Sequence, residues 1–465
     1  MADCGSPDSG QTWHMLSGAE VKEVLEKHQR FLAGQPGGRC ATLSFHDLTG
    51  IDLSGRDLSG ADLSGARLKQ ARLTGTKLKG ATLFCADLRM ANLERADLTG
   101  ADLRGVCLRG AELSDAVLAK ADLRQASVAR YSGSGEPQLN EFEEVPSQLT
   151  AIVAHRVDLA HAKVANAYLL QADLTDANLS FVDMSGVDLR NSVLIGANFE
   201  GAQLRDADLG GAALTGADLS EASIRGARFE KADLRGTVLD PNDLDCDEIK
   251  SALLPAMTRL SEIDLAAMLA PHKAWLDSNG KDGERAEFTG HDLSGRSLAR
   301  ANLSVAQMEC CALRDSDLAK AGLAMANLAC ADLRGAKLQG ADLRGVNLGR
   351  ATLTGADLTD ADLGPIEHIG QSDHSSPANL EHARLIGAKL AGANLTGARL
   401  HAADLRGADL TGADLTDADL SHANLSGARL GDAKLTGAKL DGIKGLDPDQ
   451  IAPASETKTK SRQAG

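Results

Sequence analysis

A large apolar residue, most often leucine, recurs at every fifth position through most of the chain, and alanine usually stands two residues before it. The first run extends from Leu43 to Val128, and three more runs cover residues 159–239, 288–363 and 380–440. This spacing excludes an amphipathic helix, because successive leucines would be rotated by about 140° and would scatter over every face. In an extended segment, both apolar residues of an Ala-x-Leu triplet point to the same side, and the residue between them points to solvent. The pattern therefore predicts short strand segments joined by two-residue corners.

Repeats this short cannot bury a hydrophobic face alone, so they must stack into a solenoid. Segments such as Ala-Asp-Leu-Ser-Gly at 61–65 and Ala-Asp-Leu-Thr-Asp at 413–417 resemble the pentapeptide repeat family, with its A(D/N)LXX units. The resemblance covers about two thirds of the chain. It implies a right-handed quadrilateral β-helix, an all-β solenoid in which four repeats form one square coil and leucine and alanine fill the interior. Neighbouring coils would be hydrogen-bonded at a spacing of roughly 4.8 Å.

The sequence also contains an internal duplication outside the repeats. Ser17 and Glu20 have the spacing of a capping box, and helix-spaced apolar residues follow them; a related segment with Ser261 and Asp264 stands 244 positions later. We expect two tandem modules, each beginning with a helix that covers the open end and the strand edges of its solenoid. Pro271 should kink or split the second helix, because it removes a backbone donor.

Two breaks in the five-residue register predict inserted loops, which in a regular rod are the expected places for specific recognition. The first loop carries several glutamates around Phe142. The expected organisation along the chain is a disordered tail (1–15), a cap helix (16–40), a β-helix (41–128), an inserted loop (129–155), the β-helix continued (156–245), a linker (246–260), a second cap helix (261–287), a β-helix (288–363), an inserted loop (364–378), the β-helix continued (379–445), and a terminator with a disordered tail (446–465).

Composition is consistent with a narrow aliphatic interior, since 43% of the residues are apolar but only 3% are aromatic. We expect a soluble cytoplasmic protein, because no secretory signal or membrane-spanning stretch is visible. The net charge of −16 is unevenly distributed. Residues 41–130 contain 13 basic and 11 acidic side chains, whereas residues 131–250 contain 9 basic and 21 acidic ones. This distribution argues against direct nucleic-acid binding through a basic groove but is compatible with an acidic surface for basic partners.

The eight cysteines are irregularly spaced and include no CxxC pair, so they indicate neither a disulfide framework nor a zinc site. Cys310 and Cys330 occupy the same repeat position one expected coil apart, within plausible bridging distance. Reduced thiols are the ordinary state in the cytosol, and the sequence leaves open whether this pair is bonded.

No phosphate-binding loop, HExxH motif, Walker motif or nucleophile elbow occurs in a suitable context. A filled solenoid also offers flat faces rather than a concave pocket, so we expect no enzyme activity, no catalytic residue, no cofactor and no metal. His46 and His291 take the inward position that alanine normally occupies, near the expected place of His28 and His272 on the helices. We interpret these two sets as polar junctions between helix and first coil; imidazoles at close range are also common metal ligands, and any further role is left open.

A second histidine group comprises His382, His401 and His422, and its default interpretation is a chance occurrence on the surface.

Two functions compete at this stage. The first is a non-catalytic protein-interaction scaffold built from two rigid rods, with protein partners of unknown identity and no membrane or nucleic-acid contact. The alternative comes from the resemblance: some family members imitate DNA by shape and negative charge and bind type II topoisomerases such as DNA gyrase. The acidic residues of 131–250 favour this alternative, and the near-neutral remainder weakens it. Binding by a mimic should fall as salt rises, whereas a scaffold that binds through its loops should lose binding when residues 129–155 are deleted.

Overall fold

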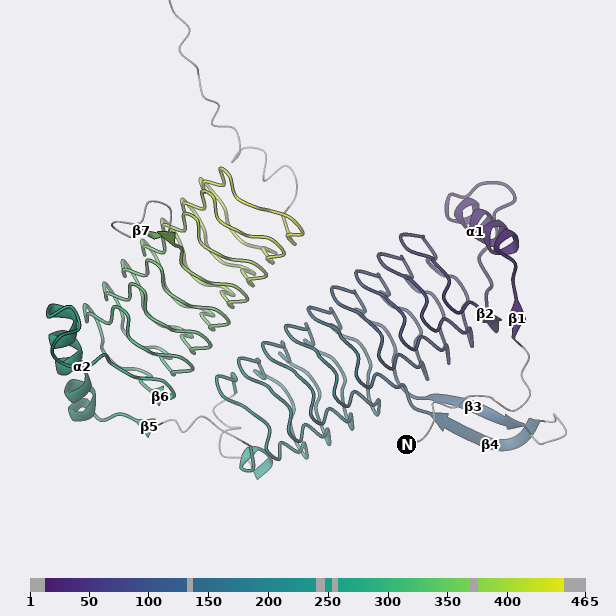
Figure 1. Cartoon of the computed structure of the whole chain (residues 1–465), viewed down its shortest axis with the longest axis horizontal. Coiled ribbons are helices and arrows are strands. Elements are labelled where there is room, and N and C mark those ends of the chain that lie inside the picture. The colour runs from purple at the N-terminus through teal and green to yellow at the C-terminus, as the bar shows by residue number, and fades with distance from the viewer. Residues whose placement is uncertain (1–12, 132–136, 240–246, 253–257, 368–374, 447–465) are drawn as a thin grey trace, which may run out of the picture. The chain divides into compact units, whose positions relative to one another are not determined.

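Each repeat forms one side of a square coil, and each repeat stacks on the one four repeats before it. The computed structural model describes residues 13–131, 137–239, 247–252, 258–367 and 375–446 (Figure 1). Parallel backbone bridges join mid-side residues 20 positions apart, such as Asp47 with Arg67 and Asp52 with Arg72. Four five-residue repeats therefore complete one turn, which confirms the predicted coil.

The chain divides into two compact units, Met1–Leu254 (unit 1) and Pro255–Gly465 (unit 2), and each has its own hydrophobic core. Within each coil the leucine and the alanine before it are buried, while the residue between them is more exposed. The second corner residue has a left-handed backbone conformation, as at Gly65 with φ of 62°. A β-carbon is unfavourable in that conformation, by roughly 1–2 kcal/mol, which accounts for the many glycines at this position.

One helix begins each unit, α1 over Gly18–Leu32 and α2 over Glu262–Asp277. Ser17 and Ser261 are the N-caps, and each forms the predicted capping box with the acidic residue three positions on. Of the two effects predicted for Pro271, a split does not occur, since α2 continues through this residue. Proline removes one backbone donor, and the neighbouring hydrogen bonds of a packed helix tolerate that single loss.

Both helices pack on the core of their own unit through apolar side chains (Figure 1). The contacts come from Val21, Val24 and Leu25 in α1, and from Leu265, Met268 and Leu269 in α2.

A short strand precedes each helix and pairs with the first coil. Strand β1 (His14–Met15) is parallel to β2 (His46–Asp47), and β5 (Thr258–Arg259) is parallel to β6 (His291–Asp292). The expected tail over 1–15 and linker over 246–260 are therefore too long, because strand pairing satisfies the free edge of the first coil in each case. The remainder of the two expected tails, 1–12 and 447–465, lies outside the described residues.

The first insertion is a β-hairpin rather than an irregular loop. Strands β3 (Ala126–Tyr131) and β4 (Pro137–Val145) are antiparallel, and the coil resumes where Gln148 pairs with Cys107. The expected boundaries at 128 and 156 are thus corrected: Val128 belongs to β3, and two repeats assigned to the loop belong to the coil. These two repeats are difficult to recognise in the sequence because their inward positions do not carry the usual alanine and leucine. Ser147, Ile152 and Ala154 stand there instead, and all three are buried.

The second insertion is smaller. Strands β7 (Ile366–Glu367) and β8 (Ser375–Ser376) are antiparallel, and Asn379 then pairs with Asn347, so the coil resumes where the sequence predicts. At the far end of unit 1, the short 3₁₀ helix η1 (Asp247–Ile249) places Ile249 in the core of that unit. Residues 247–249 are therefore part of unit 1 and not of a free linker.

Candidate functional site

The interior of both units is filled, which leaves only their surfaces for binding. Leucine and alanine side chains at successive inward positions are almost all less than 3% exposed, and Phe199, Phe229 and Phe288 are completely buried. The described residues contain no group of three or more His, Cys, Asp or Glu side chains that could hold a metal ion.

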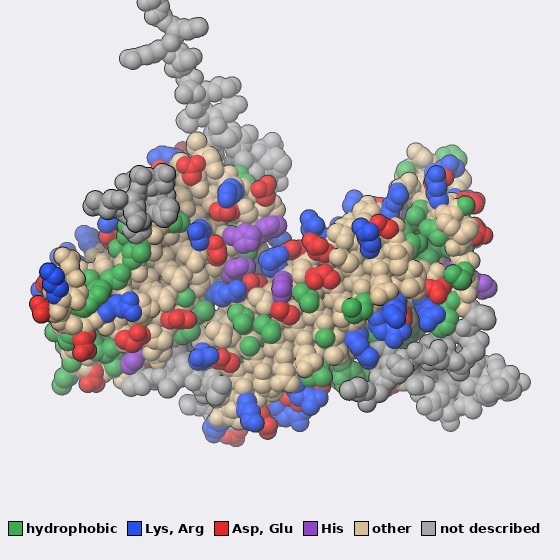
Figure 2. Space-filling model, in the orientation of Figure 1, with side chains coloured by type: hydrophobic (Ala, Val, Ile, Leu, Met, Phe, Trp, Pro, Cys, Tyr) green, Lys and Arg blue, Asp and Glu red, His purple; other side chains and the backbone are tan. Residues whose placement is uncertain are grey.

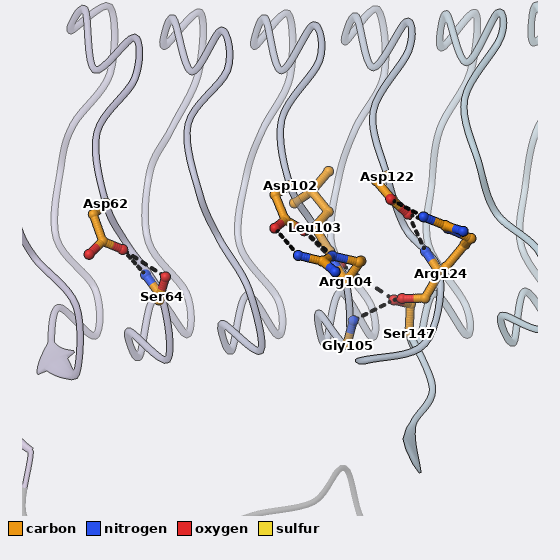
Figure 3. A network of polar contacts seen from close by, with 9 residues as sticks. All are labelled: Asp62, Ser64, Asp102, Leu103, Arg104, Gly105, Asp122, Arg124 and Ser147. Carbon is orange, nitrogen blue, oxygen red and sulfur yellow. Dashed lines mark hydrogen bonds and ion pairs between the residues drawn. The ribbon is translucent and has the colours of Figure 1, made fainter. Parts of the chain in front are cut away.

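The aspartates at the middle of the sides are engaged within their own repeats (Figure 3). The Asp62 carboxylate accepts hydrogen bonds from the backbone N–H and the hydroxyl of Ser64, at 3.0 and 2.7 Å. Arg104 donates its backbone N–H and two guanidinium N–H groups to Asp102, the latter at 2.8 and 2.7 Å. The hydrogen bonds from the Arg104 side chain hold the pKa of the Asp102 carboxyl below its ordinary value. Such local pairing removes much of the negative charge that a basic partner would meet.

The same pairing of an aspartate with an arginine two positions on recurs along both units. It occurs in Asp87–Arg89, Asp102–Arg104, Asp122–Arg124, Asp188–Arg190, Asp233–Arg235, Asp332–Arg334, Asp342–Arg344 and Asp404–Arg406. On the face seen in Figure 2, positive and negative side chains are interspersed accordingly.

The acidity of the second segment lies largely outside its coils. Residues 147–239, which form the resumed coils, contain 12 acidic and 8 basic side chains. The remaining acidic excess of 131–250 falls in the hairpin and in residues 240–250. The expected acidic second array is therefore only weakly acidic as a rod.

The root of the β3–β4 hairpin contains a buried hydroxyl at the point where the coil resumes (Figure 3). Ser147 Oγ accepts a hydrogen bond from the Gly105 N–H at 3.0 Å and lies 3.1 Å from the Arg124 carbonyl oxygen, to which it donates. Beside it, Arg109 Nη2 donates to Gln148 Oε1 at 2.7 Å. These bonds fix the start of the resumed coil, and so the base of the hairpin. Sequence reasoning missed Ser147; the signal was a serine two positions before a leucine, in the place of alanine.

The two helix histidines form equivalent contacts in the two units. The Ala41 N–H donates to His28 Nδ1 and the Ala286 N–H donates to His272 Nδ1, both at 3.1 Å. Both histidines are 0% exposed, and neither Nε2 atom has a hydrogen-bond partner. Burial lowers the pKa of both imidazoles. The predicted polar junction between helix and first coil is present, and it uses the backbone of the coil.

His46 and His291 are half-buried residues of β2 and β6, in the first coil of each unit, where the adjacent strands β1 and β5 pair with them. Their backbone N–H groups donate to the Leu43 and Phe288 carbonyl oxygens, as those of the alanines at equivalent positions do. The Nδ1 atom of His46 lies 2.8 Å from the Ser44 carbonyl oxygen, and its ring lies 5.8 Å from that of His14.

The group His382, His401 and His422 comes together more closely than its default interpretation implies. The ring centroids lie 5.8 Å apart for the first two and 5.3 Å apart for the last two, both edge to face. The signal in the sequence is the spacing of close to 20 residues, which corresponds to one coil.

Cys310 and Cys330 occupy equivalent corners of adjacent coils, as expected. A second feature that sequence reasoning missed is Trp13, whose ring lies 4.3 Å from the Arg67 guanidinium and whose Nε1–H donates to the Gly65 carbonyl oxygen at 3.2 Å.

In the part of the chain that the structure describes, no helix is both long and apolar enough to cross a membrane.

A family model for pentapeptide repeats matches much of the chain, and no curated protein matches it. The matched segments are residues 47–83, 61–100, 78–115, 96–128, 155–191, 172–211, 183–220, 202–240, 326–364, 378–417 and 413–444.

Several solved structures are similar in part. QnrB1, a plasmid-mediated fluoroquinolone resistance protein, is 21% identical over 45% of this chain and 93% of its own, with a TM-score of 0.24. Rfr23, a pentapeptide repeat protein from the cyanobacterium Cyanothece 51142, is 23% identical over 31% and 91%, with a TM-score of 0.20. HetL, from the cyanobacterium Nostoc and involved in the regulation of heterocyst differentiation, is 24% identical over 91% and 97%, with a TM-score of 0.15. At these identities and TM-scores none of the three indicates a function for this chain.

Proposed function

The chain belongs to the pentapeptide repeat family and forms a right-handed β-helix, and from this premise we propose that it is a non-catalytic scaffold that binds other proteins through its surface. In this proposal the chain consists of two rigid rods, and each helix closes the open end of its rod. The apolar contacts of α1 and α2 with the cores of their units support that role for the helices.

The packed interior is the main support for a non-catalytic function. A substrate needs a cavity in which reacting groups converge, and the inward positions here are taken by packed leucine and alanine side chains. A partner can then meet only the flat sides, the corners and the inserted strands. Rigid surfaces of this kind bind with little ordering cost, which suits a scaffold.

Within the surface, we assign recognition to the hairpin of β3 and β4. It interrupts an otherwise regular side, and it leaves the coil at Ala126 and returns at Val145, next to the buried bonds of Ser147. A hairpin on a rigid base combines a distinctive shape with a fixed position, as binding loops on other scaffolds do.

DNA mimicry has weaker support. The resumed coils of 147–239 carry a small acidic excess, and the recurring Asp–Arg pairs neutralise carboxylates at a spacing of two residues. A mimic needs rows of carboxylates that are free to meet basic groups of the partner.

Deletion of the hairpin tests the proposal directly. Removal of residues 126–146 joins Gln125 to Ser147 and restores the five-residue spacing between Leu123 and Leu149. We expect the full chain to capture a defined set of proteins from a cell lysate, and this variant to lose them. The measurement is the identity and amount of captured protein by mass spectrometry.

The matched control is deletion of residues 366–377, which restores the same spacing between Leu363 and Leu380. It should retain the captured proteins, and circular dichroism should give the same spectrum for both variants. Equal capture with and without the hairpin would contradict the assignment, and turnover of a substrate by the purified chain would contradict the scaffold.

A further inference from the structure

The two units differ at the end that lies away from the helix. In unit 1, residues 247–252 cover the last coil, and Ile249 is completely buried among its side chains. The Lys231 N–H of that coil donates to the Ser251 carbonyl oxygen at 3.0 Å. The inward side chains of the coil are accordingly buried, as at Phe229.

The terminal coil of unit 2, residues 426–445, is less well covered. Its inward side chains Leu430, Leu440 and Ile443 pack on the core but are partly exposed. One coil earlier, the Leu410 N–H donates to the Arg429 carbonyl oxygen at 2.8 Å. No described residue accepts such a bond from the N–H groups of Leu430 and Leu440. The terminal coil therefore presents an apolar centre and an unpaired strand edge, to which a further segment can add.

Each side of the terminal coil has a basic residue at its middle. These residues are Arg429, Lys434, Lys439 and Lys444. The first three form ion pairs with aspartates one coil earlier, at 2.6, 2.8 and 3.1 Å, yet their side chains remain 71%, 67% and 66% exposed. Residues 426–445 contain these four basic side chains and two acidic ones. A positive ring thus surrounds the apolar centre, and a segment that is acidic and partly apolar complements it.

Such a segment follows directly in the chain, past the described residues. Residues 447–456 contain three acidic side chains and no basic one, and they include Ile451. Ten residues extend to about 33 Å, whereas the three extended residues of one side cover about 10 Å. A second copy fits less well, because two identical ends would bring their basic rings together. We propose that residues 447–456 bind to the terminal coil of unit 2 and extend its β-helix by two sides.

The register of this segment supports the placement. Asp449 follows Arg429 by 20 positions, the separation that joins the side residues of adjacent coils along the rod. Its carboxylate then meets the Arg429 guanidinium from the side opposite Asp409. Gln450 and Ser455 fall at the leucine positions of the two added sides. Polar residues at these positions suit a final coil with one surface in water.

The two prolines of the segment are compatible with strand addition. Pro448 and Pro453 fall at the positions of the inward alanine. The N–H at that position bonds within its own coil, as the Ala433 N–H does with the Leu430 carbonyl oxygen at 3.0 Å. Proline there removes no hydrogen bond between coils. The segment thereby gives unit 2 the protected end that residues 247–252 give unit 1.

The test uses a chain that ends at Leu446, with a fluorescent peptide of residues 447–457 as the probe. We expect the shortened chain to bind one peptide, as measured by fluorescence anisotropy. The full chain should bind none at the same concentrations, because its own segment occupies the site. Arg429→Ala in the shortened chain should weaken binding by about two- to fivefold, the usual effect of an exposed ion pair. Asp449→Asn in the peptide should weaken binding as much, with no further effect on the Arg429→Ala chain.

Lys389→Ala is the matched control. Lys389 stands at the middle of the same face as Arg429, two coils earlier, and its side chain is 64% exposed and lies 3.7 Å from Asp357. The variant should bind the peptide as the shortened chain does, and circular dichroism should give the same spectrum for both variants. Hydrogen exchange provides a second measurement. The Leu430 amide should exchange more slowly in the full chain than in the shortened one, because the segment supplies its acceptor.

Several results would overturn the proposal. These are failure of the shortened chain to bind the peptide, equal binding by the full chain, an equal effect of Lys389→Ala and Arg429→Ala, and equal exchange of the Leu430 amide in the two chains. Dimers of the full chain that Arg429→Ala dissociates would also overturn it, because they would identify a second copy as the occupant of the terminal coil.

Discussion

Replacement of Phe199 by alanine should lower the free energy of unfolding of unit 1 by about 3–5 kcal/mol, the usual cost of removing a buried aromatic ring from a core. Phe199 is 0% exposed and stands at an inward position, one rung from Leu179 and one from Leu219. Backbone hydrogen bonds fix each coil to the next, so the coils cannot move together to close the space left by the ring. The neighbouring inward side chains are already packed. The cavity should therefore remain, and its cost should be near the upper end of the range.

Phe181→Ala is the matched control. Phe181 is 46% exposed at a corner, where its ring stacks on that of His161 at 5.2 Å. Its loss should cost less than about 1 kcal/mol. Urea unfolding followed by Trp13 fluorescence, in a Trp275→Phe background, reports unit 1 alone, because the two tryptophans lie in different units. Equal losses for the two variants would mean that Phe199 does not lie inside a filled coil.

Acidification should destabilise the junction between helix and coil in both units. Burial holds the pKa of His28 and of His272 below the ordinary value of about 6.5, so both imidazoles are neutral in the folded chain. Below that pH the unfolded chain takes up protons that the folded chain does not, and stability is lost as pH falls from about 6.5 through the folded pKa. The backbone of Ser304 raises the pKa of His272 and Arg285 lowers it further, but burial has the larger effect. The Asp57 carboxylate raises the pKa of His28, and there too burial has the larger effect.

The ring stacking of His272 on Trp275, with centroids 6.2 Å apart, provides the measurement. In a Trp13→Phe background, Trp275 fluorescence should change with a midpoint below pH 6.5, because a protonated imidazole quenches indole.

His272→Leu removes the acceptor of the Ala286 N–H and should cost about 1–3 kcal/mol, the usual cost of an unsatisfied buried donor. It should also flatten the dependence of unit 2 stability on pH. His291→Leu is the control, since His291 is half-buried and its Nδ1 lies 3.1 Å from the Thr289 carbonyl oxygen. A fluorescence midpoint above 6.5, or the same pH dependence in His272→Leu, would refute this account of the junction.

The coil was predictable because each repeat carries the same local information. A period of five, with alanine two positions before leucine, predicts coils that stack so that equivalent positions of successive coils lie above one another. With four repeats in each turn, the bridges then join residues 20 positions apart. The capping boxes at Ser17 and Ser261 were likewise predictable, since the interaction is local.

Features that depend on contacts distant in sequence were not predictable. The pairing of β1 with β2 is one of them, because it joins His14 to His46 across the intervening helix α1. Ser147 and Ile152 differ from the usual inward residues in size or polarity, so the coil between 147 and 155 read as loop. The sequence shows that residues 131–250 are acidic. It does not show that most of this acidity lies outside the coils, because that requires knowing where the hairpin ends.

In the proposed scaffold, partner binding depends on the shape and position of the hairpin rather than on excess charge. The measurement that tests this most directly is the amount of partner retained by the immobilised full chain as salt rises from about 0.05 to about 0.5 M, a range over which screening removes charge-dominated contacts. The scaffold predicts that retention changes little over this range and disappears when residues 126–146 are deleted. Loss of the partner by moderate salt, with no effect of the deletion, would contradict the account and would favour mimicry of DNA.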